Sequence, residues 1–163
     1  MITMRQFLIP GLYWFSAIGC GVMSGIYFAF SAFIMTSLAR IAPPSGIAAM
    51  NAINVEIVRS LFMPLFLGTT LAAGILAALA LFRWSAPGSA ATLAAGILYV
   101  AGMFVVTMMI NVPLNDALAA VDPSGADGAA LWARYLRDWT FWNHIRTIGS
   151  LGASVLFVIA MRR

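Results

Sequence analysis

The sequence predicts an all-α integral membrane protein, a four-helix bundle with helical loop segments on one membrane face. Hydrophobic residues make up 63% of the 163-residue chain, whereas roughly 45–50% is usual in soluble proteins. Charged residues contribute only 9%, and the mean hydropathy is +0.97. Four long stretches carry no charge at all. So few charges exclude both a soluble globule and a disordered chain.

The charge-poor runs give the expected membrane spans. A helix needs about 20 apolar residues to cross a hydrocarbon layer of about 30 Å. We therefore place spans at about residues 7–33, 62–82, 90–110 and 143–161, all within a single transmembrane domain of residues 1–163. The first run is much longer than the core of a signal peptide, which has about 7–15 apolar residues. We interpret it as a span.

The two long connections between spans are expected to be helical. In the first, apolar and amide residues recur at steps of three and four, as in one face of a helix: Ile47, Met50, Asn54, Ile57 and Leu61. Pro64 is expected to kink this helix where it enters the second span. In the second connection, aromatic residues and an arginine fall on one helical face: Trp132, Tyr135, Trp139, Trp142 and Arg146.

The distribution of arginine predicts the orientation. With four spans, both termini share one membrane face with the short turn at Pro87-Gly88, and both long connections share the other. The face of the termini carries four arginines and no acidic residue: Arg5, Arg83, Arg162 and Arg163. Because arginine near helix ends favours the cytoplasmic side, we expect a multi-pass protein of the bacterial inner (plasma) membrane with both termini cytoplasmic.

Composition also limits the partners and cofactors. The net charge of +4 comes from arginines that form no patch, so no nucleic-acid partner is expected. Cys20 is the only cysteine, which excludes an internal disulfide, a Cys-x-x-Cys redox centre and a thiolate zinc site. No cofactor is predicted, although haem or a metal ion held by His144 stays open. The expected partners are membrane lipids and a hydrophobic small-molecule substrate, and a homo-oligomer stays open.

The fourth charge-free run is too short to span a membrane alone. Residues 147–161 are 15 in number and make a helix of about 22 Å. The span must therefore include polar residues on its N-terminal side, namely Asn143, His144 and Arg146. Polar groups at this depth usually face the bundle interior or a wet cavity. The alternatives are an arginine that snorkels to the interface and a structural histidine.

Amide side chains gather at the same membrane face. Asn111 and Asn115 share a helix face if the helix continues through Pro113; otherwise Asn115 caps a following helix. Asn54 precedes the second span. Both long connections lie on one face, so we expect these polar groups to converge at the mouth of the bundle together with Trp139: Asn54, Asn111, Asn115, Asn143, His144 and Arg146.

Two segments and one further residue resemble a known family. Asn111-Val-Pro-Leu-Asn115, Trp139-Thr-Phe-Trp-Asn143-His144-Ile-Arg146 and Asn54 are similar to the anthrone-oxygenase-like family of small four-span membrane proteins. The resemblance covers nearly the whole chain and is most specific in the Trp-Asn-His-x-Arg segment. Some relatives are implicated in oxidising anthrones to anthraquinones with dioxygen and no conventional cofactor. The resemblance implies the four-span fold and the position of a site.

This resemblance suggests a membrane oxygenase or oxidoreductase that acts on a hydrophobic, anthrone-like aromatic molecule. His144 is then the candidate general base, because imidazole exchanges protons near neutral pH. Arg146 and Asn143 would stabilise the oxyanion. The remaining candidates would bind the substrate: Asn54, Asn111, Asn115, Tyr135 and Trp139. A non-catalytic binder or transporter of a lipophilic molecule is the alternative, followed by a haem-binding or metal-binding membrane protein.

Overall fold

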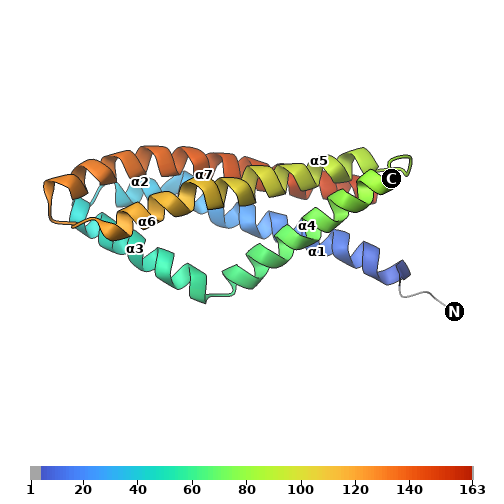
Figure 1. Ribbon diagram of the computed structural model, residues 1–163, viewed down its shortest axis with the longest axis horizontal. Coiled ribbons are helices and arrows are strands. Elements are labelled where there is room, and N and C mark those ends of the chain that lie inside the picture. Colours follow the sequence, from blue (N-terminus) through green and yellow to red (C-terminus); the bar gives the residue numbers. More distant parts are fainter. Residues whose placement is uncertain (1–4, 163) are drawn as a thin grey trace.

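A computed structural model describes residues 5–162, and its regular elements within that range are all helices (Figure 1). The all-α prediction is therefore confirmed. Seven α-helices are joined by short turns or by π-helical turns, written η. In chain order the elements are α1 (Arg5–Ala29), η1 (Phe30–Ile34), α2 (Met35–Leu38), α3 (Pro43–Arg59), α4 (Phe62–Phe82), α5 (Ser89–Tyr99), η2 (Val100–Val105), η3 (Thr107–Asn111), α6 (Val112–Ala120) and α7 (Ala126–Met161).

Four continuous helical stretches in the described residues are long and apolar enough to cross a membrane. They are Phe7–Leu38, Phe62–Phe82, Ser89–Ala120 and Asp127–Met161. The chain is thus a multi-pass membrane protein with the predicted number of spanning helices. The start of α1 and the end of α7 lie at the same end of the bundle as the α4–α5 turn (Figure 1). The side of the membrane that they face stays a prediction, as do the span limits 7–33, 62–82, 90–110 and 143–161.

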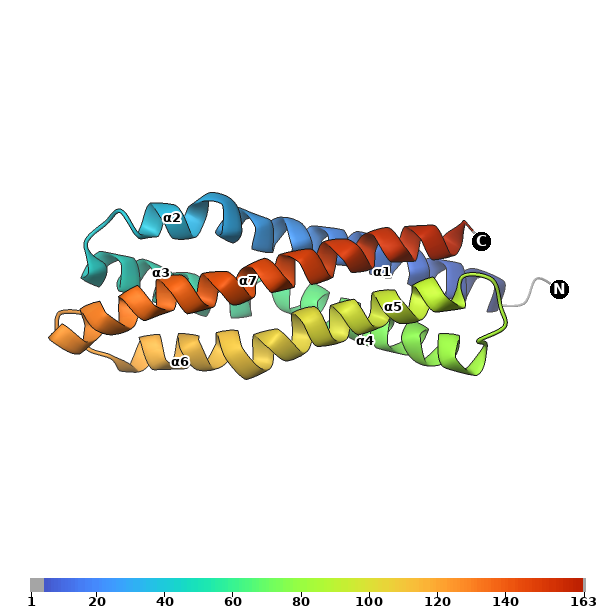
Figure 2. The ribbon, with the colours of Figure 1, turned by 90° about the horizontal axis from the view of Figure 1, so that it is seen from above.

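Three of these stretches are much longer than a bilayer is thick. Helix α7 has 36 residues and measures about 54 Å, against a hydrocarbon layer of about 30 Å. It runs the whole length of the bundle beside α5 and α6 (Figure 2). We call the part that contains α2, α3, α6 and the start of α7 the loop half. The rest of the described bundle, including α1, α4, α5 and the end of α7, is the membrane half. The loop half consists of the predicted helical loop segments.

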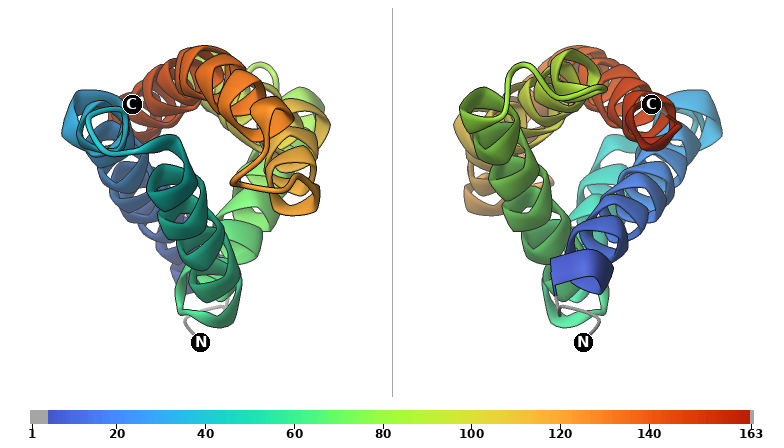
Figure 3. Two further views of the ribbon diagram at one scale, coloured as in Figure 1. Left: turned by 90° about the vertical axis from the view of Figure 1, so that its left-hand side faces the viewer. Right: turned by 90° about the vertical axis from the view of Figure 1, so that its right-hand side faces the viewer.

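The corner between α3 and α4 differs from the prediction. The helix does not continue through Leu61 to a kink at Pro64; it ends before Ser60, whose backbone is extended (φ −90°, ψ 176°). Pro64 has no N–H for the Ser60 carbonyl, and its ring would clash with that carbonyl in a continuous helix. The Ser60 hydroxyl donates to the Ile57 carbonyl (2.8 Å) and accepts from the Phe62 N–H (3.1 Å). Helices α3 and α4 therefore form an open V (Figures 1 and 3).

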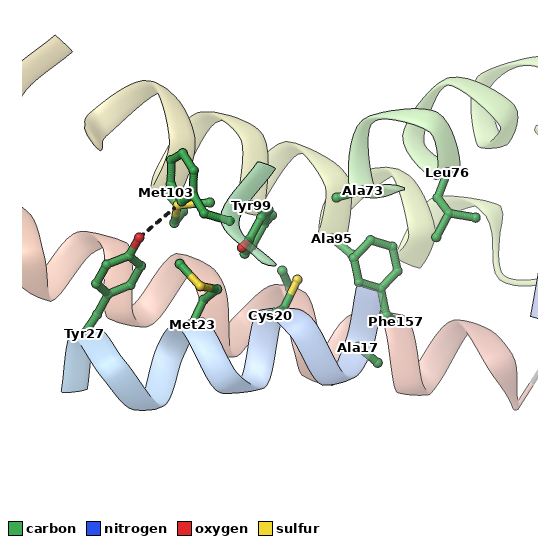
Figure 4. Close-up of a cluster of buried hydrophobic side chains, with 12 residues drawn as sticks. Ala17, Cys20, Met23, Tyr27, Ala73, Leu76, Ala95, Tyr99, Met103 and Phe157 are labelled. Atoms are coloured by element: carbon green, nitrogen blue, oxygen red, sulfur yellow. Dashed lines mark hydrogen bonds between the residues drawn. The ribbon is translucent and has the colours of Figure 1, made fainter. Parts of the chain in front are cut away.

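The core of the membrane half mixes small and sulfur-containing side chains with aromatic rings such as Tyr99 and Phe157 (Figure 4). Cys20 is a free thiol with no exposed surface. The Tyr27 hydroxyl donates to the Met103 sulfur at 3.4 Å. Helices α4 and α5 approach closely, because a Cβ added to Gly96 would overlap the Ala77 side chain. Such close packing of small residues is typical of helices in lipid.

The core of the loop half consists of stacked aromatic rings. Trp132 and Tyr135 stack at 5.6 Å between ring centroids, and Tyr135 and Trp139 at 5.8 Å. All three side chains and that of Arg146 are buried, whereas Trp142 is only half-buried, so the predicted helical face is confirmed except at Trp142. Gly46 permits α3 to lie against Trp132, since a Cβ on Gly46 would be 2.6 Å from the Trp132 ring.

Candidate functional site

A cavity of about 230 Å³ lies where the two halves meet. Its wall comes from α1 and η1, α3, α4, η3 and α6, and α7, so most of the chain contributes to it. Most lining side chains are apolar. The lining residues that carry polar atoms are Tyr27, Asn54, Thr107, Asn115, Trp139 and Arg146. The site therefore combines a lipid-like wall with a few polar groups, as ligand pockets commonly do.

Arg146 is the one charged residue in the cavity lining. Its side chain is 4% exposed, so the alternative of a snorkelling arginine is excluded. The guanidinium lies over the rings of Tyr27 and Trp139, 4.4 and 4.9 Å from their centroids. One terminal nitrogen donates to the Asn143 side-chain oxygen (2.7 Å) and the other to the Thr107 hydroxyl (3.4 Å).

Within the described part of the chain, no carboxylate forms an ion pair with this cation. The ion pairs found among residues 5–162 use Arg59, Arg134 and Arg137, all on exposed surfaces. A buried charge costs several kcal/mol unless it is paired or solvated. Aromatic faces and neutral oxygens compensate Arg146 only in part. The cavity thus offers a positive charge that an anionic or strongly dipolar ligand would neutralise.

Asn143 holds Arg146 in place. Its amide nitrogen donates to the Tyr27 carbonyl and to the Ser31 hydroxyl, both at 2.7 Å. Its oxygen accepts from Arg146, as described above, and the residue is fully buried. Both ends of the amide are therefore used within the protein. Asn143 ties α7 to α1 and positions the guanidinium rather than presenting a free group to a ligand.

The two asparagines of the third span face inward together. Asn111 donates to the Trp139 carbonyl (3.2 Å), and the Asn115 oxygen accepts from the Tyr135 hydroxyl (2.7 Å). The helix continues through Pro113, which lies in the first turn of α6 after the π-helical turn η3. Asn115 is consequently inside a helix and caps none. Such π-helical turns are frequent at functional sites, and η1 and η3 both border this cavity.

Three residues that line the cavity carry buried N–H donors without a partner in the protein. They are Asn54 through Nδ2, Trp139 through Nε1 and Arg146 through Nε. Unpaired buried donors are uncommon and each costs about 1–3 kcal/mol. Nearby, the Asn111 side-chain oxygen also lacks a partner. A ligand with a carbonyl or anionic oxygen would accept hydrogen bonds from the three free N–H groups of Asn54, Trp139 and Arg146.

His144 does not join the cluster, so that expectation is wrong. Its side chain is exposed, and it does not line the cavity. It follows Asn143 directly, and successive residues of a helix point about 100° apart. With Asn143 and Arg146 inward, His144 points outward. The expectation of no cofactor stays a prediction, and a haem or metal ion held by His144, the alternative left open, would lie outside the cavity.

The structure therefore brings together most of the predicted site. Seven of the candidates lie at or beside the cavity: Asn54, Asn111, Asn115, Tyr135, Trp139, Asn143 and Arg146. Sequence reasoning missed Tyr27 and Thr107. Thr107 had a usable signal, because it precedes Asn111 and Asn115 by steps of four. Tyr27 had none, since its contact with Arg146 joins residues far apart in the chain.

The fold and site together define a helical multi-pass membrane protein with a small, mostly apolar cavity and an unneutralised arginine in its wall. A family model described as anthrone oxygenase matches residues 55–156. The chain therefore belongs to the anthrone oxygenase family, which confirms the resemblance seen in its sequence. The matched region contains Asn111, Asn115, Trp139, Asn143 and Arg146. No curated protein and no solved structure matches the chain.

Proposed function

We propose that the protein is a membrane oxygenase that oxidises a flat, anthrone-like aromatic ketone with dioxygen. The observation that carries this proposal is the buried, unneutralised Arg146 in the wall of an otherwise apolar cavity. Membership of the anthrone oxygenase family supports the class of reaction. The substrate would be lipid-soluble, because the cavity wall is mainly apolar and the protein lies in a membrane.

The volume and the aromatic walls of the cavity suit a small ring system. Its volume of about 230 Å³ is below the range of roughly 300–1,000 Å³ that is usual for drug-sized ligands. Aromatic side chains form several of its walls, including Phe30 and Trp139, whose ring centroids are 5.5 Å apart. Flat rings pack well against such faces. A small polycyclic ketone would thus bind with its edge oxygen toward the polar groups.

The polar groups suit an anionic intermediate. The methylene of an anthrone loses a proton to give an anion whose charge lies on the carbonyl oxygen. Arg146 would stabilise that oxygen by charge, and the free N–H groups of Asn54 and Trp139 would donate to it. The anion then passes electrons to dioxygen. Overall the methylene carbon loses two hydrogens and gains one oxygen, and the second oxygen atom leaves as water.

The residues that line the cavity also bear on the fate of the proton. In the described part of the chain, no histidine, aspartate or glutamate lines it. We therefore assign the proton to water at the mouth of the cavity, and Arg146 acts by making the anion stable enough to form. His144 has no role in this proposal.

A binder or transporter of a lipophilic anion is the second candidate. The specific observation that favours it is the same lack of an acid or base in the lining, because binding needs no proton acceptor. Arg146 would then hold the anion without promoting any reaction. Oxygen consumption separates the two functions.

The test is oxygen uptake by the purified protein with a panel of anthrones, measured together with quinone absorbance. We expect Arg146→Gln to lower turnover about 10²–10³-fold, the usual effect of removing one oxyanion donor. Arg146→Lys keeps the charge and should retain more activity. Arg134→Gln is the matched control, since Arg134 lies on the same helix with a 65% exposed side chain. Equal activity of Arg146→Gln and Arg134→Gln would contradict the proposal.

If the wild-type protein binds a quinone but consumes no oxygen with any anthrone, the binder or transporter function is preferred. Thermal unfolding of each variant in detergent shows whether lost activity reflects lost structure. A variant that binds quinone as the wild type does, yet turns over slowly, would support a role for Arg146 in the reaction itself.

A further inference from the structure

A second hollow adjoins the cavity from outside. It measures about 550 Å³ and lies between α1 and the corner where α3 meets α4. Three of its lining residues, Ile26, Ile57 and Phe62, also line the cavity. All three are only half-buried. The two hollows are therefore separated by a wall that is one side chain thick.

The outer hollow opens toward lipid. Helix α4 has 21 residues and is about 32 Å long, which matches a hydrocarbon layer of about 30 Å. Its C-terminal end lies at the same end of the bundle as the start of α1 and the end of α7, so its N-terminal end, with the hollow, lies near the opposite edge of the hydrocarbon (Figure 1). Val22 and Leu61 form part of the rim and are 46% and 85% exposed.

The outer hollow is lined almost entirely by apolar side chains. Its lining includes one hydroxyl, that of Ser60. This hydroxyl donates its proton to the Ile57 carbonyl and accepts a hydrogen bond from the Phe62 N–H. No polar side chain of the lining is left to hold a hydrated solute. The hollow fits an apolar molecule that arrives dissolved in lipid.

The wall between the hollows is built from separate segments. Ile26 belongs to α1, whereas Ile57 and Phe62 lie on either side of the break at Ser60 and Leu61. Across this break the regular helical ladder gives way to turn bonds and to the Ser60 hydroxyl, which bridges the Ile57 carbonyl and the Phe62 N–H. A rotation at Ser60 that breaks this bridge would separate these two side chains and join the hollows.

We propose that this outer hollow is the passage by which the flat aromatic ketone moves from the membrane into the cavity, with Ile26, Ile57 and Phe62 as its gate. The class of ligand rests on the proposed function, whereas the passage itself requires binding and not turnover. A residue of the passage that lies outside the cavity should affect how fast the ligand enters and leaves, and not how tightly it binds.

The test places a removable block in the passage. Val22 lines the outer hollow but not the cavity. In Val22→Cys, labelling with a benzyl disulfide-forming reagent would fill the hollow, because the native Cys20 is fully buried and out of reach. Leu71→Cys is the matched control, since Leu71 is a 66% exposed apolar residue of α4 outside both hollows. The probe is anthraquinone, followed by stopped-flow quenching of tryptophan fluorescence.

We expect the label on Val22→Cys to slow association and dissociation of anthraquinone alike, by about tenfold or more, which is about 1.4 kcal/mol of added barrier. The equilibrium dissociation constant should stay within about twofold. A reductant should restore both rates, and the label on Leu71→Cys should change neither.

Unchanged rates after complete labelling of Val22→Cys would overturn the passage, as would a weaker affinity with an unchanged association rate. Absence of anthraquinone binding to the unlabelled protein would overturn it as well, because the cavity would then not hold this class of ligand. Binding with the expected rate changes but no oxygen uptake from anthrones would contradict the oxygenase reaction alone and leave the passage established.

Discussion

The loop half and the membrane half of this bundle pack by different means, although α7 runs through both. The loop half is held by large stacked rings such as Trp132 and Tyr135. The membrane half combines a close fit of small residues, such as Gly96 against Ala77, with aromatic pairs such as Phe62 and Phe66. The difference follows from the solvent. Burying aromatic area is strongly favourable where the alternative is water, whereas in lipid the gain comes from close helix contact.

The cavity lies at the boundary between these two packing modes. Large rings face it from both sides: Phe62 and Phe66 from the membrane half, and Phe30 and Trp139 from the loop half. Polar groups that would be costly deep in lipid, such as Arg146 and Asn143, are buried at this level. The site thus lies at the level where the two cores meet, beside the continuous helix α7.

The largest expected effect on stability concerns the aromatic core. Trp132→Ala should destabilise the loop half by about 3–5 kcal/mol, as is usual when a buried aromatic ring is removed. The membrane half should keep its helices, because its core does not depend on this ring. Hydrogen exchange measured helix by helix in detergent would show the effect. Equal loss of protection in α4 and α5 would show that the two halves are one cooperative unit.

A smaller effect is expected at the boundary itself. Asn143→Ala removes the bonds to Tyr27, Ser31 and Arg146 and leaves the guanidinium with fewer partners. We expect a loss of about 1–3 kcal/mol, with a fall in turnover because Arg146 is no longer positioned. Asn143→Asp would supply a carboxylate to Arg146 but would place an oxygen against the Tyr27 carbonyl, which now accepts from the amide. It should therefore lower turnover by neutralising Arg146 and restore stability only in part. Thermal unfolding and oxygen uptake, measured together, distinguish the two effects.

Gly96→Ala tests the packing of the membrane half. The added methyl group would overlap Ala77, with backbone of α4 also close (the Ala73 carbonyl at 2.9 Å). Overpacking of this kind costs about 1–3 kcal/mol, and the affected helices should be α4 and α5. Gly74→Ala is the control, since its added Cβ would meet nothing within 4 Å. Equal thermal stability of these two variants would argue against close packing at Gly96.

The smallest expected effect is at His144. Because its side chain is exposed, His144→Ala should change stability by less than about 0.5 kcal/mol. Turnover should also stay close to that of the wild type, since His144 does not line the cavity. Oxygen uptake by this variant decides whether His144 is the general base or takes no part in the reaction. A large loss of turnover in a folded protein would restore the histidine as the base.

Much of the site followed from spacing alone. The steps of three and four from Trp132 to Arg146 predicted one buried face, and the shortness of the last charge-free run predicted that Arg146 enters the bundle. Asn111 and Asn115 followed in the same way once the helix was seen to pass Pro113. The error at His144 came from treating neighbours in sequence as neighbours in space, although successive helical residues diverge by about 100°.

The sequence by itself determined the number of spanning helices, the helical nature of the connections and the inward face of α7, because composition and periodicity are local properties. Only the tertiary structure decided that Tyr27 lies against Arg146, that the α3–α4 corner opens at Ser60, and that Arg146 has no carboxylate partner. These features depend on how separate helices approach one another. A contact such as that between Asn143 and the Tyr27 carbonyl spans 116 residues of chain, and no periodic pattern within one helix records it.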